Sequence, residues 1–464
     1  MTEAPAASAA PAGTSTRIGR TTSSAKPSLT RSSGSPRVKS PAVASTANAP
    51  TWTRCSPIAT RTPPRKQFLK VSIRPSSQPN WNRSTARSAA RRRAVRSPAR
   101  SCFTKWRRNS SNQTDVTLHP PKTRIALVGA GNWGWQHARV FSTRADCQLV
   151  AVASRSKDRA DERARQFGIA PYTDITTMCR EQSPDLICVS LPNQAHFTPT
   201  LEVIRSGCPL FVEKPFVFHL TEADTLLAEA ASRKLFFGIN FNHRYAKPIA
   251  LARQAIDAGK LGDIVFCHWR FGGTGGTDHP FNNLIETQCH ALDMLEYLCG
   301  PIDSVMAEMT DKTKPGVYRT LVLALHFRNG AVGSLVGSYD SSYTYPGTHQ
   351  LEINGTRGRV LVEETVKRFT FSEAGNETSQ VWQAGYFNDR DRDFYQTFDA
   401  HAAAMIDARR NGQEPPVHAR AGRRALLLAM AAIESFKGGK RVDVETDSWD
   451  ASPPAPILAP PANP

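Results

Sequence analysis

The sequence lacks two patterns that would have assigned it to common protein classes. Its nine cysteines include no C-x-x-C pair, and an odd number of cysteines in so long a chain predicts reduced thiols in an intracellular compartment. No run of about 18 apolar residues occurs, so we expect no membrane-spanning helix. The most apolar segment, Ala425–Ile433, is far shorter and is typical of a packed helix.

Acidic residues are nearly missing from the first 120 positions. This segment holds 22 of the 59 Lys and Arg residues but only 2 of the 40 Asp and Glu residues. The net charge of +19 therefore lies in this segment, and the remainder of the chain is close to neutral. The balanced remainder shows no sign of a phosphate-backbone surface, so we expect no nucleic-acid partner for the folded part.

Residues 1–120 are rich in Ser, Ala, Pro, Thr and Arg and have no apolar periodicity. Such a segment cannot bury enough apolar surface to offset its conformational entropy, which predicts a disordered basic tail. The cluster "SAARRRAVRSPARS" leaves a nucleic-acid arm open, and the Arg-rich, acid-poor composition leaves a transit peptide open. We expect a cytoplasmic protein, with organelle targeting by this tail as the alternative. Residues 448–464 form a second, Pro-rich tail.

Short apolar runs alternate with helical patterns between residues 121 and 242. The runs are Arg124–Val128, Leu149–Ala153, Ile187–Leu191, Leu210–Glu213 and Leu235–Asn240. Continuous apolar character indicates strands covered on both faces, and alternation with helices predicts a parallel sheet. Among the helical patterns, Ser156 and Gly168 are placed to cap the two ends of one helix, and Thr221 with Asp224 has a capping-box spacing.

The pattern changes after about residue 263, within a second predicted domain that spans residues 243–447. Strand-like runs cover 264–271, 319–327, 331–340, 349–364 and 368–373, with hairpin turns expected at 328–330 and 354–358. Helical periodicity returns at 393–412 and 424–436. The fold class is therefore α/β: a first domain with a parallel sheet, then an α+β domain with an open antiparallel sheet.

The segment "GAGNWG" follows the first predicted strand and opens a predicted helix. In this context Gly129 permits the tight turn, Gly131 lets the backbone approach a pyrophosphate, and Gly134 allows close packing of helix and strand. The helix N-terminus adds partial positive charge for the phosphates. The loop, including Asn132 and Trp133, is therefore predicted to bind a dinucleotide. The alternative is a glycine turn without a ligand.

The second strand ends at Ala153, where NAD-binding proteins usually place a carboxylate. This sequence has Ser154 and Arg155 there, followed by Ser156 and Lys157. Hydroxyl and cationic groups suit a 2′-phosphate, which predicts that NADP is preferred over NAD. Asp158 is expected in the first turn of the following helix.

Four later segments carry chemistry: "LPNQAHF" from Leu191, "FVEKPF" from Phe211, "NHRY" from Asn242 and "CHALD" from Cys289. Together with the glycine loop they resemble the glucose–fructose oxidoreductase / inositol dehydrogenase / MocA family, over roughly residues 122–445. The resemblance implies a Rossmann domain followed by an open antiparallel sheet. In that family the free face of this sheet commonly forms dimers or tetramers, so we expect a homodimer or homotetramer.

The resemblance also implies catalytic roles. Lys214 would lie beside the nicotinamide and bind the reacting oxygen, with Glu213 also at the cofactor and Pro215 following through a cis bond. His290 matches the proton donor or acceptor. Glu286 stands four residues earlier, where the family usually has Asp. On one helix, Glu286 and His290 would share a face.

Further residues match the family around the cofactor and substrate. Asn193 and His196 match the loop that lies against the cofactor, and Arg244 and Tyr245 match a segment near the cofactor and substrate. Asp293 matches an acidic position that would orient the histidine or contact the substrate. Several plainer alternatives stay open at this point: a surface Lys214, a core His290, a solvated Glu286 and an Arg244 that forms a structural ion pair.

Elementary chemistry supports these roles. Hydride transfer from an alcohol carbon requires removal of the hydroxyl proton, and a histidine titrates near neutrality. Together with this chemistry, the resemblance implies an NAD(P)-dependent oxidoreductase acting on a hydroxyl or carbonyl group of a sugar, cyclitol or polyol, and the substrate class comes from the resemblance alone. Two alternatives are an NAD-dependent glycoside hydrolase of the same fold and a non-catalytic dinucleotide-binding regulator. No metal-ligand spacing is evident, so no metal is expected.

Overall fold

The computed structural model describes residues 121–341, 347–385, 390–445 and 449, with backbone alone for 390–393. These residues belong to one compact unit, Ser110–Pro464. The predicted tail 1–120 and all of the predicted tail 448–464 except Trp449 lie outside the described residues.

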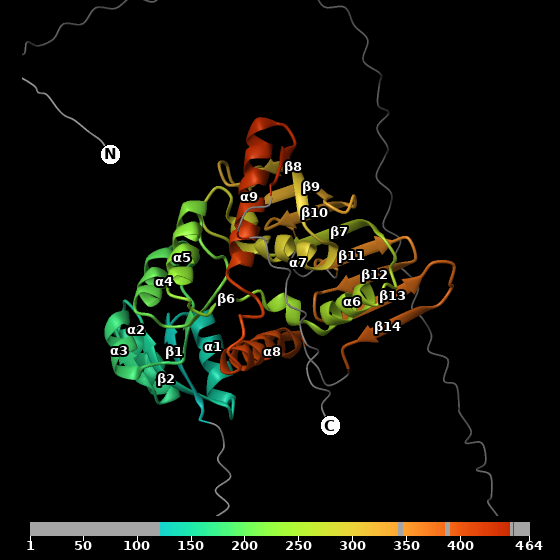
Figure 1. Cartoon of the computed structure of the whole chain (residues 1–464). Coiled ribbons are helices and arrows are strands. Elements are labelled where there is room, and N and C mark those ends of the chain that lie inside the picture. Colours follow the sequence, from blue (N-terminus) through green and yellow to red (C-terminus); the bar gives the residue numbers. More distant parts are fainter. Residues whose placement is uncertain (1–120, 342–346, 386–389, 446–448, 450–464) are drawn as a thin grey trace, which may run out of the picture. The chain divides into compact units, whose positions relative to one another are not determined.

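A parallel sheet, sheet A, forms the first part of the described chain (Figure 1). Its strand order is β3-β2-β1-β4-β5-β6, and every pairing is parallel. The strands are β1 (Thr123–Val128), β2 (Cys147–Ala153), β3 (Ala170–Tyr172), β4 (Leu186–Val189), β5 (Leu210–Val212) and β6 (Phe237–Ile239). This arrangement confirms the predicted Rossmann sheet, and only the short edge strand β3 was not predicted.

Helices connect the strands of sheet A and cover its apolar faces. They are α1 (Asn132–Thr143), α2 (Lys157–Phe167), α3 (Ile175–Gln182), α4 (Phe197–Arg205) and α5 (Leu220–Ser232), with the short η1 (Asn193–Ala195) before α4. Ser156 caps α2 by accepting the Arg159 N–H at 3.4 Å, and Gly168 ends it with φ 66°, as predicted. The capping box at Thr221 was wrong: α5 has no side-chain cap, and Asp224 instead pairs with Arg423.

A second sheet, sheet B, has the strand order β14-β13-β12-β11-β7-β10-β9-β8-β15. Its strands are β7 (Ile264–Gly272), β8 (Ile302–Thr310), β9 (Thr320–Phe327), β10 (Val332–Ser338), β11 (Gln350–Gly355), β12 (Gly358–Glu363), β13 (Arg368–Glu373), β14 (Ser379–Gln383) and β15 (Val442–Asp443). Both predicted hairpins are present. The sheet is mixed rather than purely antiparallel, because the chain returns through helix α7 (Cys289–Cys299), β8 and β9 to place β10 parallel to β7.

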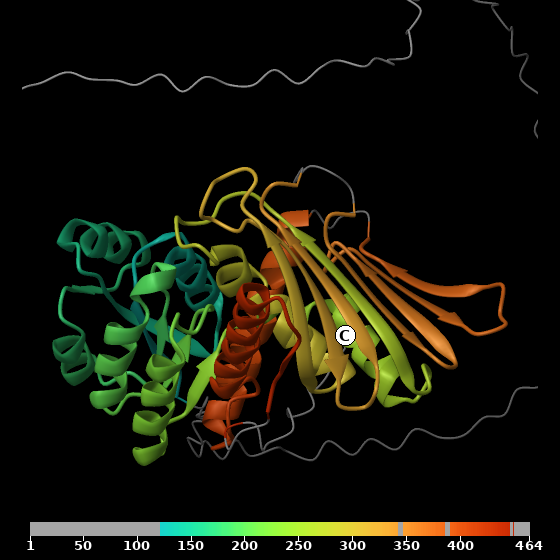
Figure 2. The same ribbon diagram turned by 90° about the horizontal axis from the view of Figure 1, so that it is seen from above.

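Helices cover one face of sheet B, as the view in Figure 2 shows for α9. The helices of this part are η2 (Asn242–Tyr245), α6 (Lys247–Asp257), the π-helical turn η3 (Asn283–Thr287), α7 (Cys289–Cys299), α8 (Arg390–Arg410) and α9 (Arg420–Gly438). Alternate residues of β7, β9 and β10 point away from α7 and α9. Among them, Phe266, Val322 and Val332 are 43–51% exposed.

Helix α8 comes late in the chain but packs against sheet A. Its residues Phe398, Met405 and Ile406 share one buried cluster with Ile125 and Leu127 of β1. The predicted domain boundary after residue 242 stays a prediction. Helix α8 belongs by sequence to the predicted second domain, but it packs against the sheet of the first. No described helix has the length and apolarity needed to cross a membrane.

Candidate active site

The glycine loop has the geometry that anion binding requires. Gly129 has φ 117°, and a Cβ there would overlap the Ser190 carbonyl oxygen. A Cβ at Gly134 would overlap the Gly129 carbonyl oxygen, whereas one at Gly131 would meet only open space. Helix α1 begins directly after Gly131 without a side-chain cap. Its first N–H groups are therefore available to a phosphate, so these residues fit a dinucleotide.

The loop's two remaining residues lie at the surface. Asn132 is exposed, and the Trp133 ring is 46% exposed. That ring stacks on Phe398 of α8, with centroids 5.5 Å apart and planes 12° apart. Helix α8 therefore reaches the edge of the predicted pyrophosphate site.

The end of β2 carries the residues predicted to select the cofactor. Ser154 is half-buried, and its hydroxyl accepts the Ser156 N–H at 3.4 Å. Arg155 is exposed, and Asp158 lies in the first turn of α2 as expected. Arg163 of α2, which belongs to no motif of the sequence, also reaches the glycine loop, where its guanidinium donates to the Ala130 carbonyl at 3.0 Å.

Lys214 follows β5 at the carboxyl edge of sheet A. The peptide bond to Pro215 is cis, as predicted. Its ammonium donates to the Glu286 carbonyl oxygen at 3.3 Å, which links the end of β5 to η3. Ligands of open parallel sheets bind at this edge. The half-buried lysine therefore lies at the edge where ligands of such sheets bind.

Glu286 lies in the turn η3 with its side chain buried. Its carboxylate accepts the Thr277 hydroxyl at 3.0 Å. Burial raises the pKa of Glu286, while hydrogen bonds from Thr277 and Asn193 and the charge of Lys214 oppose that rise. The structure thus brings Lys214, Glu286 and Asn193 together.

His290 is the second residue of α7 and is 6% exposed. Its ring stacks on that of His243, with centroids 3.9 Å apart. Burial lowers the pKa of His290, and the neighbouring His243 and Lys214 act in the same direction. The expectation that Glu286 and His290 lie on one regular helix was wrong, because η3 ends at Thr287 and α7 begins at Cys289.

Arg244 and Asp293 form a buried pair with each other. The guanidinium donates twice to the carboxylate, at 2.9 and 2.5 Å. Burial raises the pKa of Asp293 against the opposing charge of Arg244. The structure therefore favours the ion-pair alternative over substrate binding for both residues, and Asp293 does not orient His290. Tyr245 is half-buried and stacks on His401 at 4.3 Å.

Two predicted cofactor residues have structural partners instead. His196 is buried, and its Nε2 lies 3.0 Å from the Leu191 carbonyl oxygen, which secures the loop. The Glu213 carboxylate lies 2.6 Å from both His137 Nε2 of α1 and Asn240 Nδ2 beyond β6. Glu213 is thus turned into the protein and ties three elements together, rather than facing the cofactor.

Family models match both parts of the chain. A model described as "Oxidoreductase family, NAD-binding Rossmann fold" matches residues 123–241, and one described as "GFO/IDH/MocA C-terminal domain" matches residues 249–361. The chain belongs to the GFO/IDH/MocA oxidoreductase family.

Several named proteins are similar in sequence to this family member over most of the described chain. Myo-inositol 2-dehydrogenase of Thermotoga maritima is 25% identical over 69% of this chain and 98% of its own length. The NAD(+)-dependent scyllo-inositol 2-dehydrogenase of Bacillus subtilis is 24% identical over 70% and 97%. A levoglucosan dehydrogenase structure with NADH and levoglucosan has the same fold, with a TM-score of 0.64 and 19% identity over 70% of this chain and all of its own.

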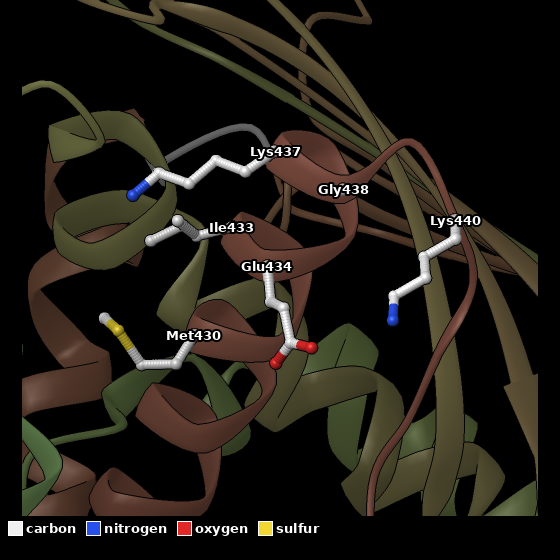
Figure 3. Close-up of a pocket in the computed structure, with 6 residues that line it drawn as sticks. All are labelled: Met430, Ile433, Glu434, Lys437, Gly438 and Lys440. Atoms are coloured by element: carbon white, nitrogen blue, oxygen red, sulfur yellow. The ribbon is translucent and has the colours of Figure 1, made fainter.

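A hollow of about 470 Å³ lies elsewhere in this GFO/IDH/MocA protein, at the C-terminal end of α9 (Figure 3). Met430, Ile433, Glu434, Lys437 and Lys440 line it. None of the predicted site residues lines this hollow. We therefore place the candidate active site where Lys214 contacts η3, next to His290, and not at this hollow.

Proposed function

We propose that this protein transfers a hydride between a nicotinamide dinucleotide and a hydroxyl or carbonyl group of a sugar, cyclitol or related polyol. One observation carries the proposal: at the carboxyl edge of the sheet that carries the glycine loop, the Lys214 ammonium donates to the Glu286 carbonyl oxygen of η3 at 3.3 Å, four residues before His290. The inositol and levoglucosan dehydrogenases among its relatives support this substrate class.

The chain's own residues would divide the work as follows. The bound nicotinamide supplies the hydride chemistry. Lys214 would bind the substrate oxygen and polarise it, and neutral His290 would accept the hydroxyl proton during oxidation and return it during reduction. Glu286, whose pKa is raised by burial, would hold a neighbouring hydroxyl of the substrate. Proton and hydride thus leave the carbinol group together, and a carbonyl remains.

We further propose that NADP is bound in preference to NAD. Support comes from the end of β2, where Ser154 and exposed Arg155 stand in place of a carboxylate. Arg163, which contacts the glycine loop, adds a second positive charge nearby. Titration calorimetry with both dinucleotides tests this preference. Tighter binding of NAD than of NADP to the wild type would contradict it.

Lys214→Met tests the proposed chemistry. Loss of the ammonium should lower kcat by about 100-fold or more while the dissociation constant of the dinucleotide changes little, because the methionine keeps the shape of the side chain. Activity on a polyol and sugar panel is followed by nicotinamide absorbance. Exposed Lys234→Met is the matched control. Release of sugar without a change in absorbance would favour a glycoside hydrolase, and full biological activity of Lys214→Met would favour a non-catalytic regulator.

A further inference from the structure

Two buried histidines face each other beside Lys214. His243 lies in η2, just after the last strand of sheet A, and His290 lies in α7. The rings are 3.9 Å apart between centroids, their planes differ by 5°, and the residues are 4% and 6% exposed. The Nδ1 atom of each ring is buried and lacks a hydrogen-bond partner among the described residues. The proposed reaction uses His290 alone, so His243 has no task in it.

Nothing but packing orients the ring of His290 in the part of the chain that the structure describes. The carboxylate that could have oriented it, Asp293, is occupied by Arg244. Phe241 approaches the ring of His290 at 69°, with 5.8 Å between centroids. His243 is the flat surface on which the imidazole of His290 rests. Its orientation therefore depends on a ring that belongs to another segment of the chain.

His243 is itself held firmly. Phe271 of β7 and Phe394 of α8 contact its ring at steep angles, with centroids 5.9 and 6.1 Å away. Residues of β7, of α8 and of the segment after β6 thus enclose the stacked pair. This enclosure keeps bulk water from the inner sides of the two rings.

The charges around the pair favour neutral rings. Burial lowers the pKa of His243 to about 3, and the facing groups His349 and Lys214 act in the same direction. Lys214 also faces His290. The Glu286 carboxylate of η3 accepts a hydrogen bond from Thr277, and burial raises its pKa. The Arg244–Asp293 pair one turn along α7 has no net charge. Two stacked rings in such a site cannot both hold a proton.

We infer that His243 is a positioning residue whose ring holds His290 aimed at the substrate and keeps it neutral, as a proton acceptor must be. This inference rests on the proposed function. His243 touches neither the reacting atoms nor the cofactor in this scheme, and it acts through His290. An aromatic ring at position 243 is then required, but a titratable nitrogen there is not.

The test compares His243→Phe with His243→Ala in the full-length protein, with exposed His219→Phe as the control. His243→Phe keeps the flat partner, so kcat and the pH profile of kcat/KM should stay close to wild type. His243→Ala frees the His290 ring and admits water. Its kcat should fall by about 10–100-fold, and the acid limb of kcat/KM should move to higher pH, because a hydrated imidazole is protonated more easily.

The outcomes separate the inference from the function on which it rests. Wild-type kcat and pH profile in His243→Ala would overturn the inference. So would an equal loss in His243→Phe and His243→Ala, provided that both melt and bind dinucleotide like wild type, because His243 would then act through its nitrogen. If the wild type neither oxidises a hydroxyl group nor reduces a carbonyl group of any sugar, cyclitol or polyol in the panel, the proposed function fails. NMR titration of His290 in histidine-labelled protein still decides the inference, because the pKa of His290 should be higher in His243→Ala than in wild type or His243→Phe.

Discussion

At the scale of single residues, the buried pair Arg244–Asp293 makes a stability prediction. Its guanidinium and carboxylate satisfy each other out of contact with water. Asp293→Asn would leave a buried uncompensated cation and should lower the free energy of unfolding by about 3–5 kcal/mol. Urea unfolding measures the loss.

The double variant Arg244→Met, Asp293→Leu is the matched comparison for this pair. It removes both charges and should lose less stability than Asp293→Asn alone, because no charge is left unpaired. If the double variant were less stable than Asp293→Asn, the Arg244–Asp293 pair would contribute more to the free energy of unfolding than the neutralisation of each charge by the other.

The positions of candidate residues in the fold were predictable where these residues lie in short linear motifs. The glycine loop and the Glu-Lys-Pro segment were each predicted to lie at the carboxyl end of a strand. The resemblance carried by the second segment also predicted the cis bond before Pro215. Pairings across the fold were not predictable. His243 and His290 lie 47 positions apart in the sequence, and Arg244 and Asp293 lie 49 apart. These residues come into contact only because η2 packs against α7. The sequence pattern within either segment does not indicate this packing.

At the scale of elements, the loop before α1 makes a prediction about two of its glycines. Gly131→Ala places a methyl group in open space, so the fold should survive while the dinucleotide binds at least about tenfold more weakly, since the methyl group would lie where the pyrophosphate approaches. Gly129→Ala should instead lower the melting temperature, because its φ of 117° and the nearby Ser190 carbonyl oxygen exclude a side chain.

Calorimetric binding and thermal melting of the two variants, measured side by side, check this division. Unchanged dinucleotide affinity in Gly131→Ala would contradict the proposal that this loop binds the cofactor.

Elements were predictable when their apolar pattern was strong. Five strands of sheet A are continuous apolar runs, and these were found. Strand β3, "APY", is too short to show any pattern, and β8, "IDSVMAEMT", mixes acidic residues into a half-exposed strand. The parallel pairing of β10 with β7 could not be predicted either, because it depends on the order in which distant strands join the sheet.

At the scale of the whole molecule, the exposed face of sheet B makes a prediction about assembly. Phe266 and Val332 are paired neighbours on that face and are 43% and 51% exposed. We propose that a second copy of the chain covers them, since apolar sheet faces of this kind are association sites. Light scattering after gel filtration should find a dimer or tetramer, and Phe266→Glu with Val332→Lys should yield monomers. A monomeric wild type would contradict the proposal.

The buried histidines predict how stability depends on pH. Burial is the leading cause that lowers the pKa of four of them, His196, His243, His290 and His401, and of half-buried His418. The unfolded chain therefore binds more protons below its histidine pKa of about 6.5, so the free energy of unfolding should fall as the pH drops from 7 to 5. Glu286 and Asp293, with raised pKa values, act in the opposite direction and should reduce the slope.

Urea unfolding at pH 7 and pH 5 checks the sign. His418, with a pKa lowered to about 4, offers the control. His418→Gln should reduce the difference between the two pH values by about 1–2 kcal/mol. Equal or greater stability of the wild type at pH 5 would contradict the expected dependence.

His137 behaves oppositely at high pH. Burial favours its neutral form, but Cys188 and Glu213 outweigh burial and raise its pKa to about 10, so its contribution is lost as the pH rises toward 10.

Helix α8 has a consequence for how the protein can be made. The chain builds sheet A first, continues through sheet B, and only then supplies the helix whose Phe398, Met405 and Ile406 seal β1. A nascent chain released at residue 242 would display that apolar surface to the cell. Synthesis has to proceed beyond residue 410 before the first sheet is finished, and truncated products should be caught by chaperones or aggregate rather than persist as small independent nucleotide binders.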